Sequence, residues 1–246
     1  MWSRSSGADR LLAPQGASVQ FQLACNRAFD VGFTLVASMM LLPLAVAVSL
    51  LIWVTSPGPA LHRATRVGRA GKPFTLYKFR TMVQNAAVVG PPLTHRKDPR
   101  ITRVGGILRK TKFDEFPQVI NVLKGDMSIV GPRPEAPEYV RHYSAEQWEV
   151  LRMRPGLTSL AQVMHRNEEQ MLPAVDTEAY YLSVVLPTKL SLDFFYVTKW
   201  SLGLDLRVFL LGVLALLRIA PPACMWPVGT GVPVSNEGRR TMASRS

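Results

Sequence analysis

The sequence predicts a mostly helical α+β protein, with a membrane-embedded helical segment near the N-terminus and a small globular domain after it. The first observation is Val31–Val54, 24 consecutive residues without a charge. As one helix this stretch is about 36 Å long, enough to cross the apolar core of a bilayer. The second observation is that the later apolar stretches are short and separated by Pro- and Gly-rich turns, which is typical of short helices and strands.

The membrane segment, which we place at residues 27–58 after a loose polar leader at 1–26, has a proline in its middle. Pro43 removes a backbone hydrogen bond and bends or breaks a helix. Basic residues both precede and follow the apolar run, whereas a spanning helix carries its positive charges mainly on one side. We therefore expect a re-entrant helical hairpin broken at Pro43. The alternative is one kinked helix that spans the membrane.

Positive charge is concentrated directly after this segment. Between Arg63 and Lys112, thirteen Lys and Arg residues outnumber a single acidic residue, Asp98, which leaves as many positive charges as the whole chain's net charge of +12. Such a run is often only a solvated face. Together with a hydrophobic content of 48%, it favours a surface against anionic lipid headgroups, because nucleic acid would account for the charge alone. Cys25 and Cys224 lie far apart and indicate neither a disulfide framework nor a zinc site, so a reducing compartment is expected.

The globular domain, placed at residues 59–220, shows signals for several short elements. Partial alternation indicates a strand at Phe74–Tyr77. Ser144 and Gln147 have capping-box spacing, which indicates a helix start. The ten apolar residues Val208–Leu217 are too few to span a membrane and form either a core helix or an interfacial helix. We further expect a helix at Asp176–Val185 ended by Pro187, a loop at 84–100 and a disordered tail at 221–246.

Two adjacent carboxylates, Asp114 and Glu115, follow a basic cluster and precede a short apolar stretch. Neighbouring side chains on a helix point about 100° apart, so these carboxylates are expected to have different roles. One is suited to attack phosphorus and the other to hold a divalent ion. The alternative is a helix cap, because Thr111 and Asp114 have capping-box spacing and acidic residues stabilise a helix start. We expect the stretch that follows to bury one helical face: Phe116, Val119, Ile120, Val122 and Leu123.

Two arginines near these carboxylates are candidate phosphate ligands. The planar guanidinium of Arg109 or Arg133 matches phosphate oxygens, and the prolines on either side of Arg133 would fix its direction. The alternative for Arg133 is a surface turn. Four residues are weaker candidates for binding substrate, and each has a structural alternative: Lys78, Arg80, Gln162 and Arg166.

A series of short motifs follows in order along the chain: Phe29-Asp30, Ser56-Pro57-Gly58-Pro59, Arg66-Val67-Gly68, Gly71-Lys72-Pro73-Phe74, Tyr77-Lys78-Phe79-Arg80-Thr81-Met82, Asp114-Glu115, Asn121 to Ser128, Gly131-Pro132-Arg133-Pro134, Arg154-Pro155-Gly156-Leu157-Thr158 and Ser201 to Asp205. Over roughly residues 27 to 215 this series resembles the bacterial sugar transferase family, the monotopic polyprenyl-phosphate phosphoglycosyl transferases, in their compact form.

The resemblance implies an activity, a location and roles for residues. The activity is transfer of a sugar 1-phosphate from a UDP-sugar to undecaprenyl phosphate with release of UMP, with Mg²⁺, at the cytoplasmic face of the bacterial inner membrane. Such a step initiates the assembly of exopolysaccharide, capsule, O-antigen or glycoprotein glycans. The resemblance implies that Asp114 is the nucleophile, that Glu115 is the second catalytic carboxylate and associates with the metal, and that Arg109 and Arg133 bind phosphate. The expected partners are UDP-sugar, undecaprenyl phosphate and anionic membrane lipids, without nucleic acid, and a homodimer is allowed.

The chain departs from the family pattern in three places. Leu42 stands where a serine often precedes the helix-breaking proline, and Phe113 and Phe116 replace leucines. The segment Ala161 to Arg166 differs from the common AQVNGR at Met164 and His165, which affects the sugar and nucleotide contacts. Two other classes of function stay open: a membrane scaffold without catalysis and a basic nucleic-acid-binding protein.

Overall fold

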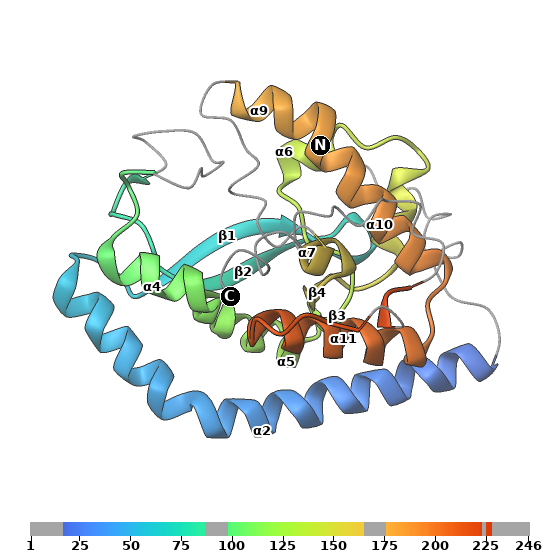
Figure 1. Ribbon diagram of the computed structural model, residues 1–246, viewed down its shortest axis with the longest axis horizontal. Coiled ribbons are helices and arrows are strands. Elements are labelled where there is room, and N and C mark those ends of the chain that lie inside the picture. Colours follow the sequence, from blue (N-terminus) through green and yellow to red (C-terminus); the bar gives the residue numbers. More distant parts are fainter. Residues whose placement is uncertain (1–16, 87–97, 165–175, 223–224, 228–246) are drawn as a thin grey trace.

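The computed structural model describes residues 17–86, 98–164, 176–222 and 225–227. One long helix, α2 (Ala17–Thr55), runs along one side of a body of shorter elements (Figure 1). The body holds two small sheets. Strands β1 (Leu61–Val67) and β2 (Pro73–Phe79) form an antiparallel hairpin, and β3 (Ser128–Val130) pairs in parallel with β4 (Gly156–Thr158). The expectation of a mostly helical chain with few strands is confirmed.

The helices of the body are short, apart from two near its C-terminal end. In chain order they are η1 (Arg69–Gly71), α4 (Arg103–Thr111), η2 (Phe113–Gln118), α5 (Val119–Lys124), α6 (Pro137–Val140), η3 (Gln147–Arg152), α7 (Leu160–Met164), α9 (Thr177–Tyr180), η4 (Tyr181–Val185), α10 (Leu186–Thr198) and α11 (Leu202–Leu216). Residues 1–16 of the expected leader, most of the loop at 84–100 and most of the tail lie outside the described residues. The expectation of a loose leader up to residue 26 is wrong for residues 17–26, which form the first turns of α2.

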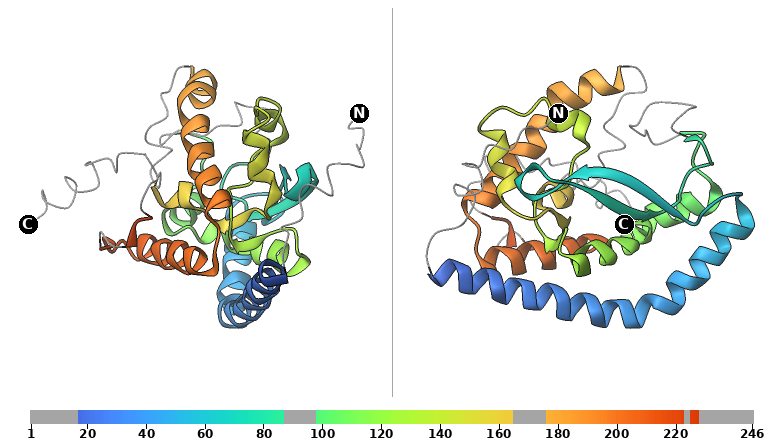
Figure 2. Two further views of the ribbon diagram at one scale, coloured as in Figure 1. Left: turned by 90° about the vertical axis from the view of Figure 1, so that its right-hand side faces the viewer. Right: turned by 180° about the vertical axis from the view of Figure 1, so that it is seen from behind.

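Helix α2 is continuous from Ala17 to Thr55, with Pro43 inside it. Figures 1 and 2 show the helix changing direction part way along its length. A proline has no N–H to donate to the carbonyl four residues earlier and bends a helix in this way. Where we expected two arms separated by a break, the chain has one bent helix. Residues Gln20–Thr55 are long and apolar enough to cross a membrane, by length and composition. A re-entrant path stays a prediction.

Much of the apolar surface of α2 is exposed. Met39, Met40, Trp53 and Val54 are each more than 60% exposed. A contiguous apolar surface of this kind marks a contact with lipid or with another protein. Helix α2 is therefore suited to a membrane environment.

The polar residues of α2 attach it to the body. Asp30 is buried and accepts hydrogen bonds from Ser128 Oγ (2.8 Å) and from the backbone N–H of Ile129 (3.0 Å) at β3. Arg27 donates to the carbonyls of Val122 (2.7 Å) and Leu123 (3.2 Å) at the C-terminal end of α5. The body is thus bound directly to the apolar helix.

Beyond the bend, α2 packs against a different part of the body. Ala45 and Ile52 are buried in a cluster with Phe79 of β2 and Leu108 of α4. The bend lets both halves of α2 follow the surface of the body, as Figure 2 shows from behind.

The expected end of a helix at Pro187 is wrong. Helix α9, the π-helical turn η4 and α10 follow one another without a gap, and Pro187 lies in the first turn of α10. A proline is tolerated there because the π turn before it has a different hydrogen-bond pattern from an α-helix, so that the N–H that proline lacks is not needed. The long helical segment that results carries buried polar residues discussed below.

The apolar stretch at Val208–Leu217 belongs to α11 and has two apolar faces. Val208 and Leu211 are completely buried, Val208 in the largest core cluster, whereas Leu206 and Leu216 are more than half exposed. The expected role as a core helix is confirmed, and a position in the membrane interface stays a prediction for the exposed face. Phe209 of α11 also packs edge-on against Phe29 and Phe33 of α2, so that the exposed faces of the two helices adjoin.

Candidate active site

A single buried side chain joins the β1–β2 hairpin to the segment that carries the two carboxylates. Asn121 of α5 is fully buried, and its Nδ2 donates to the carbonyl of Thr75 (2.6 Å) while its Oδ1 accepts from the N–H of Tyr77 (3.1 Å). These bonds hold α5 against one edge of β2. As a result Lys78, the next residue of β2, lies within reach of η2.

The two carboxylates lie in the first turn of η2, a 3₁₀-helix that begins directly after α4. Lys112, with φ of 60°, adopts the left-handed conformation that separates the two helices. Thr111 donates back to the carbonyls of Ile107 (3.1 Å) and Leu108 (3.0 Å). The alternative in which Thr111 and Asp114 form a capping box is therefore wrong, because the Thr111 hydroxyl belongs to the end of α4.

The apolar face expected for the following helix is only partly right. Val122 is completely buried, but Ile120 and Leu123 are each more than a third exposed. Two polar side chains, Gln118 and Asn121, turn inward together with Val122. The helix packs on the backbone of β2, which offers hydrogen-bonding groups, so a polar residue occupies the central buried position.

Glu115 is buried between two cations. Lys78 Nζ lies 3.0 Å from Oε1, and Arg133 contacts the same oxygen through Nη2 at 2.7 Å and Oε2 through Nη1 at 3.4 Å. Burial by itself raises the pKa of this carboxyl, but the charges of Arg133 and Lys78 and the Arg133 hydrogen bond outweigh it and hold the pKa well below 4.5. Glu115 is therefore ionised at neutral pH.

Asp114 has the opposite environment. It is 8% exposed, and its Oδ1 has no hydrogen-bond partner among the described residues. Burial and the neighbouring charge of Glu115 raise its pKa above 3.8, against the opposing charges of Lys78, Lys112 and Arg109. Adjacent carboxyls whose pKa values move in opposite directions are typical of sites in which each has its own task.

Arg109 reaches toward this pair from α4. Its Nε donates to Thr81 Oγ1 at 2.9 Å, and its charge lowers the pKa of Asp114. Thr81 supports α4 a second time, because its carbonyl accepts from the backbone N–H of Thr102, the N-cap residue of that helix. Thr81 was not among the predicted site residues; the only signal for it was its place in the Lys78–Met82 motif.

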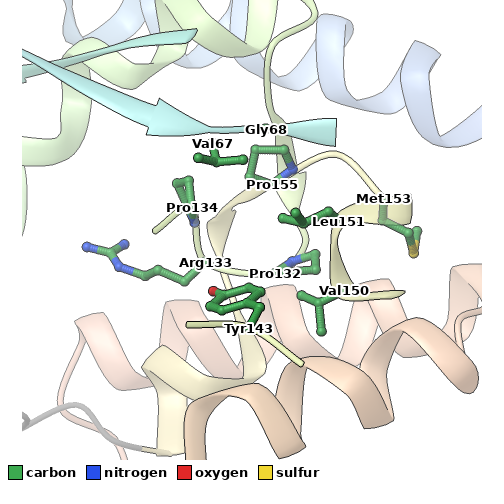
Figure 3. A pocket seen from close by; sticks show the side chains of 10 residues that line it. All are labelled: Val67, Gly68, Pro132, Arg133, Pro134, Tyr143, Val150, Leu151, Met153 and Pro155. Atoms are coloured by element: carbon green, nitrogen blue, oxygen red, sulfur yellow. The ribbon is translucent and has the colours of Figure 1, made fainter. Parts of the chain in front are cut away.

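Arg133 reaches Glu115 from the Gly131–Pro134 turn that follows β3. A small pocket lies on the other side of the turn, lined by Pro132, Arg133, Tyr143 and Pro155, among others (Figure 3). In Figure 3 the Arg133 side chain extends away from the rest of the pocket lining, consistent with its contact to Glu115. The alternative of a plain surface turn does not describe Arg133, because its guanidinium binds a buried carboxylate.

The remaining predicted residues divide into two groups. The terminal nitrogens of Arg80 donate to the carbonyls of Pro57 (2.5 Å) and Ser56 (2.7 Å), which closes the turn between α2 and β1. Gln162 and Ser159 exchange hydrogen bonds of 3.1 and 3.0 Å at the start of α7, a capping box. These contacts give both side chains a structural role, and a role in substrate binding stays a prediction. Arg166 lies outside the described residues.

Comparison with known proteins identifies a family. The family model described as bacterial sugar transferase matches residues 21–219. The chain is 41% identical over 197 residues to a UDP-glucose:undecaprenyl-phosphate glucose-1-phosphate transferase of Caulobacter vibrioides, covering 78% of this chain and 69% of that protein. It is 37% identical over 201 residues to the exopolysaccharide production protein PSS of Rhizobium leguminosarum, covering 76% and 92%.

A third relative is longer than the chain. The UDP-N-acetylgalactosamine-undecaprenyl-phosphate N-acetylgalactosaminephosphotransferase of Aeromonas hydrophila is 38% identical over 186 residues, which cover 74% of this chain and 41% of that protein. Both carboxylates and the cations around them lie inside the matched part of the family model. The chain therefore belongs to the bacterial sugar transferase family and is an enzyme of the transferase class.

Proposed function

We propose that this chain transfers a sugar 1-phosphate from a UDP-sugar to undecaprenyl phosphate and releases UMP, as an initiating step of exopolysaccharide or related glycan assembly. Two of the relatives named above are named for transfer of a phosphosugar from a UDP-sugar to undecaprenyl phosphate, and the third is named an exopolysaccharide production protein. The observation that carries the proposal is the asymmetric carboxyl pair. Glu115 is bound by two cations, while Asp114 Oδ1 has no hydrogen-bond partner in the part of the chain that the structure describes.

The proposed reaction has two displacement steps at phosphorus. An Asp114 carboxylate oxygen attacks the phosphorus that bears the sugar, a new P–O bond forms, and the P–O bond to UMP breaks. A phosphate oxygen of undecaprenyl phosphate then attacks the same phosphorus, and the bond to Asp114 breaks. The products are UMP and a polyprenyl diphosphate sugar, and the Asp114 carboxylate is regenerated.

The cations around the pair would stabilise the charge of this reaction. Arg133 and Lys78 keep Glu115 ionised and fixed, and Arg109, held by Thr81, lies on the side of Asp114. Arginine and lysine near a transferring phosphoryl group lower the cost of the charge that develops on its oxygens. Each of these side chains is oriented by a hydrogen bond or an ion pair, as preorganised stabilisation requires.

The residues present are compatible with Mg²⁺. No cluster of three or more metal-ligating side chains occurs in the part of the chain that the structure describes. Mg²⁺ needs no such cluster, because it is held by one or two carboxylates together with water and substrate phosphates. Among the described residues, Glu115 Oε2 has one hydrogen-bond contact, at 3.4 Å, and Asp114 Oδ1 has none, so both oxygens are suited to hold the ion. When bound, the ion would screen the carboxylates from the incoming phosphates.

The apolar surfaces suggest where the reaction takes place. The exposed face of α2 adjoins that of α11, and the carboxyl pair belongs to the body that Arg27 and Asp30 bind to α2. We propose that these faces lie in the cytoplasmic side of the bacterial inner membrane and bring the site to the depth of the lipid phosphate. Anionic lipids would bind the basic stretch between Arg63 and Lys112.

The test is a panel of UDP-sugars with undecaprenyl phosphate, in which UMP release is measured. Asp114→Asn should abolish UMP release and prevent capture of a sugar-phosphate-labelled enzyme. Glu149→Gln is the matched control, because Glu149 pairs only with the exposed side chain of Arg152 in the described contacts. Turnover retained in Asp114→Asn refutes the covalent scheme, and a wild type that releases no UMP from any UDP-sugar favours a scaffold.

A further inference from the structure

Behind the Gly131–Pro134 turn lies a buried group that the reaction above does not use. Asp193 of α10 is 3% exposed, and its Oδ2 accepts a hydrogen bond from the backbone N–H of Arg133 at 3.3 Å. Its Oδ1 is buried without a hydrogen-bond partner among the described residues. Stability does not account for such a residue, because a buried carboxylate with an unsatisfied oxygen destabilises a fold.

The position of the bond explains what Asp193 provides. Pro132 and Pro134 have no backbone N–H, so Arg133 carries the sole amide hydrogen between Gly131 and Glu135. The two ends of the turn are already fixed: the N–H of Gly131 donates to the carbonyl of Thr158, and the carbonyl of Glu135 accepts from Val67. Within the turn, the carbonyl of Pro132 accepts from the N–H of Gly156. Asp193 therefore binds the remaining backbone donor of the turn, at the residue whose guanidinium binds Glu115.

Helix α10 holds the turn at two places. Lys189, one helical turn before Asp193 and on the same face, pairs with Glu135 Oε1 at 2.7 Å, and Tyr181 donates to the same oxygen at 2.9 Å. Lys189 thus binds the side chain of Glu135, directly after the turn, and Asp193 binds the backbone of Arg133 within it. The helix acts as a rigid support for the active-site arginine.

We propose that Asp193 is a positioning residue for catalysis: by holding the backbone of Arg133 it keeps the guanidinium in contact with both oxygens of Glu115. The proposal rests on the proposed function for its effect on turnover, but the contact itself can be measured without substrate. A change at Asp193 should disturb Arg133 and leave the other fixed points of the turn unchanged.

Amide hydrogen exchange measures this contact directly. In the full-length protein in detergent, the segment Gly131–Pro134 carries two amide hydrogens, those of Gly131 and Arg133. Asp193→Ala removes the acceptor and should speed exchange at Arg133 about tenfold, as expected for the loss of one hydrogen bond, with Gly131 unchanged. Asp193→Asn retains an acceptor oxygen and should keep most of the protection. Ser191→Ala, an exposed position on the same helix, is the control and should change neither amide.

Turnover provides the second readout. UMP release should fall about tenfold in Asp193→Ala and recover most of the way to wild type in Asp193→Asn. Equal Arg133 exchange in Asp193→Ala and wild type overturns the proposal, as does lost protection with unchanged turnover. If the wild type releases no UMP, the proposed function fails, while the exchange result still decides whether Asp193 holds Arg133.

Acid titration decides the matter if Asp193→Ala does not fold. Burial raises the pKa of Asp193 to about 7, against the opposing charge of Lys189 and the hydrogen bond from Arg133. The other titratable or charged groups around it are Glu135, Arg133, Tyr143 and Tyr181. Protonation weakens the acceptor, so Arg133 exchange relative to Gly131 should rise as the pH falls through about 7 in the wild type. The ratio should stay constant in Asp193→Asn. A ratio that is constant in both proteins overturns the proposal.

Discussion

The two cations on Glu115 are expected to be energetically coupled, and a double-mutant cycle of Lys78→Met and Arg133→Met tests this. Both side chains bind Oε1 of one carboxylate that is 11% exposed. If either cation is removed, the other still compensates the buried charge. If both are removed, the carboxylate is left without a partner in a low-dielectric environment.

The expected magnitudes follow from this geometry. Leaving a buried charge without its ion-pair partner costs about 3–5 kcal/mol. The lower end of this range applies to the double variant, because Lys78 and Arg133 are each partly exposed. We expect about 1 kcal/mol for each single variant and about 3 kcal/mol for the double variant, a coupling of about 1 kcal/mol. Glu149→Gln, which breaks an exposed pair with Arg152, should cost less than about 0.5 kcal/mol.

The pH dependence gives the cycle its sharpest test. The folded-state pKa of Glu115 is depressed, so its stabilisation is fully present above pH 4.5 and is lost as the pH falls through the folded pKa. In the double variant burial is opposed only by the weaker influence of the Lys112 charge among these groups, and the pKa of Glu115 rises. The difference in unfolding free energy between wild type and double variant, measured by denaturant titration in detergent, should therefore be largest above pH 6 and shrink toward pH 4. Additive single effects, or a difference that does not change with pH, would refute the reasoning.

Three further predictions concern the same site. Because the pKa of Asp114 is raised above 3.8 and the nucleophile must be ionised, UMP release should rise with pH on the acid side; a rate that is flat from pH 4 to 7 contradicts this. Gly105→Ala places a methyl group against the Thr81 backbone and should destabilise the protein by about 1–3 kcal/mol and slow turnover, because Thr81 holds Arg109. Gly106→Ala, with open space around it, should be neutral or stabilising, and similar melting temperatures for the two variants would count against the argument. Chelation with EDTA should stop UMP release and added Mg²⁺ should restore it; activity that persists in EDTA removes Mg²⁺ from the scheme.

The sequence predicted those structural features that depend on a single local property of the chain. An uncharged run of 24 residues has few alternatives to a helix in an apolar environment, and α2 has that form. The spacing of Ser144 and Gln147 predicted a capping box that is present, with hydrogen bonds of 2.8 and 3.2 Å, although the helix that follows is a 3₁₀-helix. The adjacent carboxyls were visible for the same reason.

Contacts between distant residues were not visible in the sequence. Glu115 meets Lys78 from 37 residues before it and Arg133 from 18 residues after it, and no local pattern states that the two cations share one oxygen. Strand β1 was missed because its residues are mostly polar and its face is only half covered. Asp193 was missed because a single carboxylate in an otherwise apolar helix looks the same whether it is solvated or buried.

The hydrogen bonds of Arg27 and Asp30 have a consequence for dissecting the protein. An anchor that merely tethers an enzyme can be removed to give a soluble fragment with an intact site. Here a fragment that begins after residue 58 would lack the guanidinium that covers the carbonyls of Val122 and Leu123 and the carboxylate that binds Ser128. The carbonyls of Val122 and Leu123 belong to α5, and Ser128 belongs to β3. Both elements lie in the sequence between the carboxyl pair and the Gly131–Pro134 turn. The apolar helix is a structural component of the transferase fold, and truncation of it should be treated as a core deletion.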